Sequence, residues 1–319
     1  MQVFLTSVSS VVVIILIMAL GFLLKQYNWI GDSFSKEISE IITKIALPAS
    51  IFTSVMEHLN RGSLFQLVKE SLFPVLGILI GYIIAAVIVK VLKIKPGRRG
   101  IFMAASVNAN TVFIGMPLNL ALFGEKAMSY LLIYYIVNTF STWTFGAFFI
   151  QNDDPTAKSK KVKLSLKKIL PPALIGFIVA IVWMILGIPV PTFAGQTLSY
   201  VGNLVTPLSL IYIGIILHDA GLKNIRLDRD TVMALVGRFI ISPLVLIILI
   251  KIGMGAGYHM PDLMRQTLVV QSATPMPAVL PILANEAHGD VKFATNAVAL
   301  SSVLFVIVVP ILMTILKFI

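Results

Sequence analysis

The chain has 319 residues, of which 58% are hydrophobic and 12% charged, and its formal net charge is +11 at pH 7. Soluble globular domains carry roughly 25% charged residues, so this composition indicates an integral membrane protein. The absence of cysteine excludes disulfides, thiolate metal sites and cysteine nucleophiles. In such a protein the positive charge indicates basic cytoplasmic loops and not a nucleic-acid partner.

Ten segments are apolar and of a length to cross a membrane, for which about 20 residues are needed. In chain order they are 3–24, 36–57, 69–92, 99–123, 128–150, 169–187, 195–217, 230–251, 263–286 and 291–316. A polar linker with six lysines, residues 151–168, separates the fifth segment from the sixth. We therefore expect an all-α membrane protein with one five-helix half at 1–150 and another at 169–319.

The distribution of Lys and Arg predicts the orientation of these segments. With the linker in the cytoplasm, eighteen of these cations fall on the inner side and six on the outer side, while Arg238 lies inside a segment. Both termini then face outward. The first apolar run is too long for a cleavable signal peptide and lacks a basic start. We expect a multi-pass protein of the cell's inner (plasma) membrane with cytoplasmic basic loops.

Two matches between the halves indicate an internal repeat. The sequence around Pro48 resembles that around Pro207, at an offset of 159 residues. The sequence around Gly124 resembles that around Gly289, at an offset of 165 residues. Since each half has an odd number of segments, the second half enters the membrane from the opposite side. The sequence thus predicts two inverted repeats.

The fourth and ninth segments contain residues that disfavour a continuous helix. The fourth holds Asn108–Pro117, and the ninth holds Gln271–Pro281 with three prolines. Proline lacks an amide hydrogen, and Asn and Thr side chains compete for the backbone. Interrupted helices in matching positions of two halves indicate the binding site of a secondary transporter. A helix that begins at mid-membrane presents N–H groups with partial positive charge, which suits a carboxylate.

The new half-helices are expected to begin at Asn110–Thr111 and at Thr274–Pro275, because these residue types favour helix starts. A buried asparagine amide must find partners in hydrocarbon, so Asn110 is the strongest candidate. Exposed carbonyls beside the anion would suit Na⁺. The candidates at mid-membrane depth are Asn110, Thr111, Asn138, Thr274 and Pro275 for substrate, and Gln271, Ser272 and Asn108 for an ion.

Catalytic chemistry is hard to build from this chain. All fourteen acidic residues lie in loops or at segment ends, and the four histidines have no metal-binding spacing. We expect no enzyme, no metal site and no cofactor, and a proton exchanger with paired buried aspartates is disfavoured. Arg238 could pair with an anionic substrate, contact the break in the ninth segment, or snorkel to the inner surface.

Three stretches resemble the auxin efflux carrier family of membrane transporters. They are N-A-N-T-V-F-I-G-M-P-L from Asn108, L-P-A-S-I-F from Leu47, and T-P-M-P-A-V-L-P-I-L-A-N-E-x-x-G-D from Thr274. The likeness covers essentially the whole chain and fits short prokaryotic members, some described as malonate or malate permeases. It implies two inverted five-helix repeats, in a fold related to the bile-acid and sodium–proton transporters.

The resemblance also implies a division of labour among the segments. Segments 1, 2, 6 and 7 would form a scaffold, and segments 3–5 and 8–10 a moving transport domain whose fourth and ninth helices cross at their breaks. The substrate carboxylate would lie near Asn110, with Asn138, Ser50 and Phe52 facing it. Plant carriers have proline immediately before the Asn-Thr pair, where this chain has Ala109, so we expect a less sharp break in the fourth helix.

The leading hypothesis is a secondary active carrier of a small organic carboxylate anion that works by elevator-type alternating access. Its partners would be the substrate, the lipid bilayer and, by family analogy, a second copy bound through the scaffold. A sodium-coupled symporter of an organic anion, in which Gln271 and Thr274 bind Na⁺, is the alternative. A carrier coupled to H⁺ and a non-transporting membrane sensor stay open as well.

Overall fold

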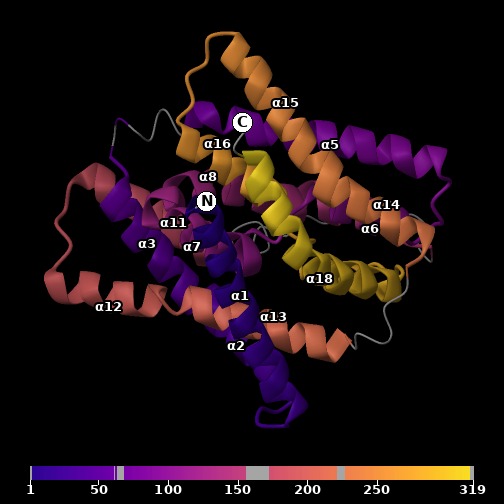
Figure 1. Cartoon of the computed structure of the whole chain (residues 1–319), viewed down its shortest axis with the longest axis horizontal. Helices are drawn as coiled ribbons and strands as arrows, with labels where there is room; N and C mark the ends of the chain where they lie inside the picture. The colour runs from indigo at the N-terminus through magenta and orange to yellow at the C-terminus, as the bar shows by residue number, and fades with distance from the viewer. Residues whose placement is uncertain (1, 61, 63–67, 156–171, 221–226, 317–319) are drawn as a thin grey trace.

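The chain is helical, with no strand among the residues that the computed structural model describes, which are 2–60, 62, 68–155, 172–220 and 227–316 (Figure 1). Helices lie within each of the ten predicted segments. The first half contains α1 (Gln2–Gln26), α2 (Phe34–Ile41), η1 (Ile42–Ala46), α3 (Leu47–His58), α5 (Leu72–Val91), α6 (Arg99–Val107), η2 (Thr111–Gly115), α7 (Met116–Phe123), η3 (Glu125–Ala127), α8 (Met128–Ser141), η4 (Thr142–Gly146) and α9 (Ala147–Asn152). The second half contains α11 (Pro172–Leu186), α12 (Thr192–Gly202), α13 (Val205–Ala220), α14 (Arg229–Val236), η6 (Gly237–Ile241), α15 (Ser242–Gly255), α16 (Asp262–Ser272), α17 (Leu280–Glu286) and α18 (Val291–Ile315).

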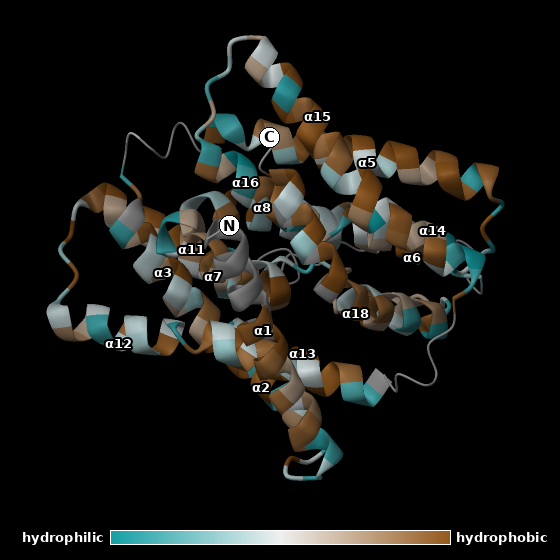
Figure 2. Ribbon diagram, in the orientation of Figure 1, coloured by the Kyte–Doolittle hydropathy of each residue, from teal (hydrophilic) through white to brown (hydrophobic). Residues whose placement is uncertain are grey.

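This is an all-helical multi-pass membrane protein. Within the described part of the chain, five helical stretches are long and apolar enough to cross a membrane: Phe34–Glu57, Val68–Val91, Arg99–Phe123, Thr192–Asp219 and Arg229–Gly255. Large apolar side chains on α5 and α15 point outward, and both helices are mostly hydrophobic along their length (Figure 2). Linker residues 156–168 lie outside the described residues. The membrane orientation and the inverted repeat therefore stay predictions.

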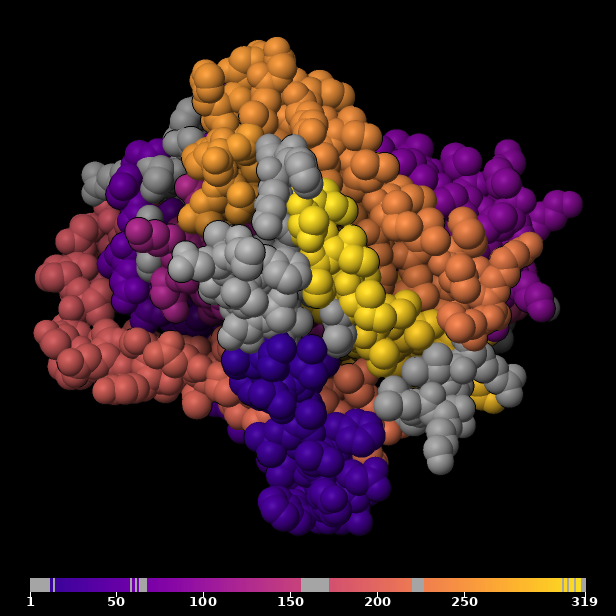
Figure 3. Space-filling model, viewed as in Figure 1, coloured from indigo at the N-terminus to yellow at the C-terminus, as the bar shows by residue number. Residues whose placement is uncertain are grey.

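The helices fall into two groups that pack mainly within themselves. In the first group α1 runs along α13, and α3 packs on α11 and α12. In the second, α5, α6, α9, α14, α15, α17 and α18 pack on one another (Figure 1). The fourth segment joins the groups, because η2 and α7 both contact α13. On the face seen in Figure 3, α18 also passes beside α1.

Close backbone approach at glycine holds α1 against α13. A Cβ at Gly214 would lie 1.9 Å from the Met18 carbonyl oxygen, and a Cβ at Gly21 would lie 2.1 Å from the Ile211 carbonyl oxygen. Helices in lipid gain little from the hydrophobic effect when they associate, so small residues that admit tight packing are favoured at such contacts. These two glycines therefore set the distance between the helices.

Close backbone approach at glycine also joins α3 to α11 and α12. A Cβ at Gly176 of α11 would lie 2.9 Å from Pro48 Cα, and a Cβ at Gly202 of α12 would lie 2.8 Å from Ser50 Cα. The L-P-A-S stretch around Pro48 is thus a packing surface on both sides.

One arginine links the starts of α6, α14 and α18. Arg98 Nη1 lies 2.6 Å from Asp228 Oδ2, and Arg98 Nε lies 2.6 Å from Asp290 Oδ2. Each carboxylate also caps a helix: Asp228 accepts from the Thr231 amide at 2.8 Å, and Asp290 accepts from the Phe293 amide at 2.9 Å. Arg98 therefore fixes three helix starts of the second group relative to one another.

We expect Gly214→Ala to destabilise the protein by about 1–3 kcal/mol, because the new methyl group must push α1 away from α13. Gly195→Ala is the matched control: the nearest atom to its Cβ would be Val190 Cγ1 at 3.7 Å. That substitution should be neutral or stabilising, by roughly 0.4–1 kcal/mol. Thermal unfolding in detergent measures both, and equal effects would contradict this account of the α1–α13 contact.

Arg98→Met should lower the unfolding temperature at neutral pH, since two helix-capping carboxylates lose their shared partner. Burial raises the pKa of Asp228, but hydrogen bonds from Thr231 and the Arg98 guanidinium outweigh it and hold the pKa below 3.8. A carboxyl with a lowered pKa stabilises the fold above its unfolded pKa, and this is lost as the pH falls through the folded value. The difference from wild type should therefore shrink below pH 3.8. A difference independent of pH would refute the role of Asp228, and the exposed Lys292→Met provides the control.

Candidate functional site

The fourth and ninth segments are both broken, and the two breaks touch. α6 ends at Val107, and residues 108–110 leave the helix, with φ −81° and ψ 148° at Asn108. α16 ends at Ser272, and residues 273–279 are not helical. The Asn110 amide donates to the Pro275 carbonyl at 2.8 Å. The break predicted in the fourth helix is confirmed despite Ala109, and it is shorter than the break in the ninth.

Asn110 begins the second half of the fourth segment, as predicted. Its side-chain Oδ1 accepts from the Phe113 amide at 3.2 Å, and its carbonyl accepts from the Gly115 amide at 3.0 Å, which closes one π-helical turn. Its Nδ2 is buried and has no hydrogen-bond partner among the described residues. Thr111, the next residue, is also buried. Since π-turns inside α-helices are frequent at functional sites, this turn marks Asn110 as the centre of the candidate site.

The prediction that Thr274–Pro275 begins a helix is wrong. α17 begins at Leu280, and the Thr274 hydroxyl donates backward to the Gln271 carbonyl at 3.0 Å. Thr274 and Met276 each precede a proline, and a residue before proline is disfavoured in the α-helical conformation. The T-P-M-P stretch therefore stays extended, and the helix resumes only beyond it.

Asn138 of α8 supports the unwound backbone at Ala109. Its Nδ2 donates to the Ala109 carbonyl at 2.9 Å, and its Oδ1 accepts from the Ala109 amide at 2.8 Å. The side-chain amide thus replaces both hydrogen bonds that a helix would have given Ala109, and no proline is needed to hold the break open. Both ends of this amide are in use, which makes Asn138 a positioning residue for the break.

Further polar side chains support the breaks from neighbouring helices. Asn108 accepts from the Tyr82 hydroxyl on α5 and donates to Ser141 Oγ on α8 at 2.9 Å. In the ninth segment the Met276 amide donates to Ser301 Oγ on α18 at 3.1 Å. The sequence drew attention to Asn108, but Tyr82 was missed, because a lone tyrosine in an apolar helix gives no local sign of its partner.

Arg238 of η6 bridges the C-terminal ends of both broken helices. The side chain is fully buried, and its guanidinium donates to the carbonyls of Val107 and Ser272, the last residues of α6 and α16. A further bond runs to Ser242 Oγ at 3.1 Å. Of the three alternatives left open for Arg238, the structure has the contact with the ninth break, and that contact extends to the fourth. Arg238 does not snorkel to the surface.

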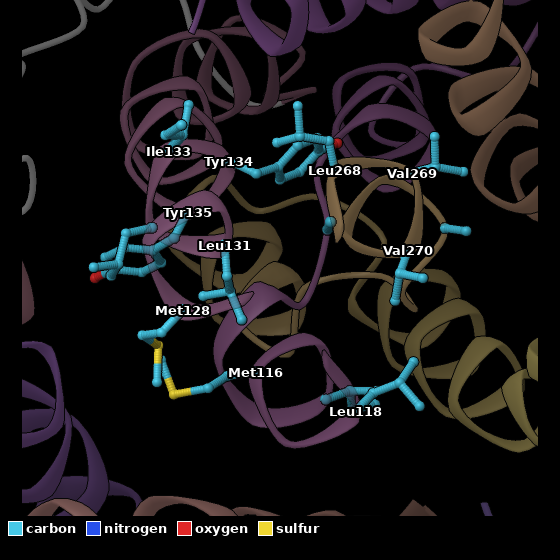
Figure 4. Close-up of a cluster of buried hydrophobic side chains, with 14 of the residues drawn as sticks. Met116, Leu118, Met128, Leu131, Ile133, Tyr134, Tyr135, Leu268, Val269 and Val270 are labelled. Carbon is cyan, nitrogen blue, oxygen red and sulfur yellow. The ribbon is translucent and has the colours of Figure 1, made fainter. Parts of the chain in front are cut away.

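The electrostatic result is an asymmetric crossover. A helix C-terminus carries about half a negative charge and an N-terminus about half a positive charge. Arg238 covers the two C-terminal ends, while the helix that runs from Thr111 to Phe123 presents its N-terminal end at Asn110. Figure 4 shows the apolar side chains packed between α7, α8 and α16, among them Met116, Leu131 and Leu268, which are fully buried. Such a dry surrounding strengthens every charge interaction at the crossover.

The three candidate ion-binding residues differ in which of their polar atoms lack a hydrogen-bond partner in the described structure. The Ser272 carbonyl is bound by Arg238, and the Asn108 side chain is bound by Tyr82 and Ser141. Gln271 is fully buried, and neither its Oε1 nor its Nε2 has a partner among the described residues. Its amide lies against Gly115, where a Cβ would be 2.2 Å from Oε1. Gln271 is thus the one of the three with unused side-chain polar atoms.

The two scaffold candidates have different neighbours from each other. Ser50 lines a cleft of about 450 Å³ between α3, η3, α12 and α13, together with Glu57, Glu125 and Asn203, and Asn110 is not among its lining residues. The Phe52 ring packs edge-on against Trp183 of α11, with ring centroids 6.2 Å apart. The crossover therefore gathers the candidates from the fourth, fifth, eighth and ninth segments, while the place of Ser50 and Phe52 beside the substrate stays a prediction. Among the described residues no group of His, Asp and Glu could hold a metal ion.

Asn138→Ala should lower the free energy of unfolding by roughly 2–4 kcal/mol, because two hydrogen bonds are lost and both polar groups of Ala109 stay buried. Asn285→Ala, which removes an exposed amide from α17, should change it by less than about 0.5 kcal/mol. Thermal or denaturant unfolding in detergent gives both values. Equal stability of the two variants would show that Ala109 does not depend on Asn138.

Residues 6–313 match the family described as membrane transport protein. The chain is 24% identical over 305 residues to an uncharacterized transporter of Methanocaldococcus jannaschii, which covers 94% of this chain and 96% of that one. It is 23% identical over 312 residues to an uncharacterized transporter of Methanothermobacter thermautotrophicus, which covers 97% of this chain and 98% of that one.

The match confirms the expectation that the chain belongs to a transport family of the auxin efflux carrier type. The closer likeness to malonate or malate permeases stays a prediction. The family is one of transporters and not of enzymes. The matched residues, 6–313, overlap every helix that the structure describes. The chain therefore belongs to the membrane transport protein family.

Proposed function

We propose that this transporter is a secondary carrier of a small organic carboxylate anion, with monocarboxylates and dicarboxylates, malonate and malate among them, as the first compounds to test. One observation carries the proposal. Arg238 covers the C-terminal ends of α6 and α16, so the polar groups left without partners at the crossover include the donors Asn110 Nδ2 and Gln271 Nε2. Buried donors without partners, beside a helix start and a fixed cation, suit a carboxylate.

Elevator-type alternating access is the mechanism we propose. The packing of α1 on α13 and of α3 on α11 and α12 supports a scaffold of segments 1, 2, 6 and 7. The Arg98 cluster supports a transport domain of segments 3–5 and 8–10 that moves as one body. Under the predicted inverted repeat, the α1–α13 and α11–α3 pairs are equivalent, which agrees with two related halves. The scaffold would also form the homodimer, and the basic loops would face the cytoplasm.

A sodium-coupled symporter is the second candidate, and the unused Oε1 of Gln271 favours it. Thr274, the other residue expected to bind Na⁺, already donates its hydroxyl to the Gln271 carbonyl. No carboxylate lies at the crossover in the described structure, and the buried Arg238 opposes a second cation there. Stabilisation by Na⁺ but not by K⁺ in a thermal-shift assay would favour the symporter.

Asn110→Ala should weaken carboxylate binding at least tenfold, since a charge-assisted hydrogen bond contributes about 1.5–3 kcal/mol. The measurement is substrate-dependent thermal stabilisation together with uptake into proteoliposomes. Uptake by the wild-type protein also separates a carrier from a sensor.

Asn119→Ala is the matched control. Asn119 is an equally buried amide in the same segment, and its Nδ2 donates to the Gly115 carbonyl at 2.8 Å. Its loss should lower stability and leave affinity nearly unchanged. The proposed site is refuted if Asn110→Ala folds and binds its substrate as the wild type does.

A further inference from the structure

We infer that Arg238 sets the substrate charge, and that the carrier selects anions with a single negative charge over dianions of the same skeleton. The inference rests on the proposed function and names the charge class of its substrate. It depends on three observations: the charge at the crossover, the partners of Arg238 and the donors left for a ligand.

The first observation is the count of buried charges. In the described structure the buried charged side chains are Lys25, Glu70, Asp230 and Arg238. Lys25 lies at the end of α1, Glu70 precedes α5, and Asp230 lies in the first turn of α14 beside Arg98. Arg238 alone among them sits at the crossing of the broken helices. The formal charge there is that of one guanidinium.

The second observation is that the partners of Arg238 carry no formal charge. The guanidinium donates to two backbone carbonyls and to the Ser242 hydroxyl, and the Tyr134 hydroxyl is its neighbour. These dipoles bind Nη1 and Nη2 and hold the group in place, while Nε has no partner among the described residues, and none of these dipoles neutralises the charge. A bound monoanion would bring the formal charge at the crossover to zero. A dianion would leave one negative charge without a partner in a buried region, which is unfavourable.

The third observation concerns the number of donors. Among the described residues, Asn110 Nδ2 and Gln271 Nε2 are buried amide donors without partners, one from each broken helix, and Arg238 Nε is a further unpaired donor. Both residues adjoin Gly115: the Gln271 amide lies against it, and the Gly115 amide donates to the Asn110 carbonyl at 3.0 Å. The two amide donors match the two oxygens of one carboxylate. No second cation in the described residues of the crossover would receive another carboxylate.

The charge match has a consequence for transport. The transport domain would be positively charged at its centre when empty and neutral when it holds a monoanion. A membrane potential acts on charge that moves across the membrane. Return of the empty domain would therefore be the voltage-dependent step, and movement of the loaded domain would not be.

The test uses ligands of one skeleton with different charges. Malonate, succinate and phthalate are each compared with their monomethyl and dimethyl esters, at neutral pH, by thermal shift and competition on the full-length protein in detergent. For each skeleton that binds, we expect the monoester to bind at least tenfold more tightly than the diacid, and the uncharged diester not to bind.

A variant with an added cation should shift the preference from monoanions toward dianions. Gln271→Lys places a second cation beside Gly115 and should shift the ratio of diacid to monoester affinity toward the diacid by roughly tenfold or more. Gln271→Met, of similar length and without charge, should not shift it toward the diacid. Lys251→Met removes an exposed cation at the far end of α15 and should leave the wild-type ratio unchanged.

The outcomes separate this inference from the proposed function. Diacids that bind the wild type as tightly as their monoesters overturn the charge match, while loss of their binding in Asn110→Ala would still support carboxylate transport. An unchanged ratio in Gln271→Lys also overturns it. Failure of every mono- and dianion to bind overturns the proposed function and this inference with it.

Discussion

The bonds from one guanidinium to two helix-ending carbonyls are the constraint on which the crossover depends. A helix that stops inside a membrane leaves carbonyls that neither lipid nor water can satisfy. Arg238 meets this need for α6 and α16 at once, and the carbonyls in turn offset the cost of burying a cation. A lysine could not reproduce this easily, because the planar guanidinium presents several donors in a fixed fork. The last carbonyl of each helix is thus bound, and the amide side of the crossover is left for a ligand.

The rest of the break is held by side chains that replace backbone partners. Asn138 takes both polar groups of Ala109, Asn108 is fixed by Tyr82 and Ser141, and the ninth segment is bonded to Ser301. These supports come from α5 and α18 of the second group and from α8, which packs on α5, so the breaks are embedded mainly in the second group of helices. Motion of that group past the first would carry the site without remaking its hydrogen bonds. This is the physical basis on which an elevator motion is proposed here.

Much of this arrangement was predictable from sequence because its signals are local. Apolar runs predicted the ten helical segments. The stretches Asn108–Pro117 and Gln271–Pro281 predicted the two breaks. The start at Asn110 followed from helix-capping chemistry, whereas Thr274–Pro275 failed because the next proline, Pro277, keeps Met276 extended. The partners of Arg238, Asn138 and Tyr82 could not be predicted, since each lies on another segment and the bonds depend on how helices pack. Ser50 and Phe52 were taken from a family likeness: Ser50 lines a cleft, Phe52 packs on Trp183, and their contact with substrate stays a prediction.

The most direct measurement is a structure with a bound carboxylate that carries a heavy atom, such as an iodinated acid chosen for binding in the thermal-shift screen. Anomalous scattering or difference density would locate it without reference to mutants. The account predicts a carboxylate beside Asn110 and Gln271, on the side of the crossover away from Arg238's carbonyl partners. Density for the carboxylate in the cleft at Ser50, or at any other place remote from the two breaks, would contradict it.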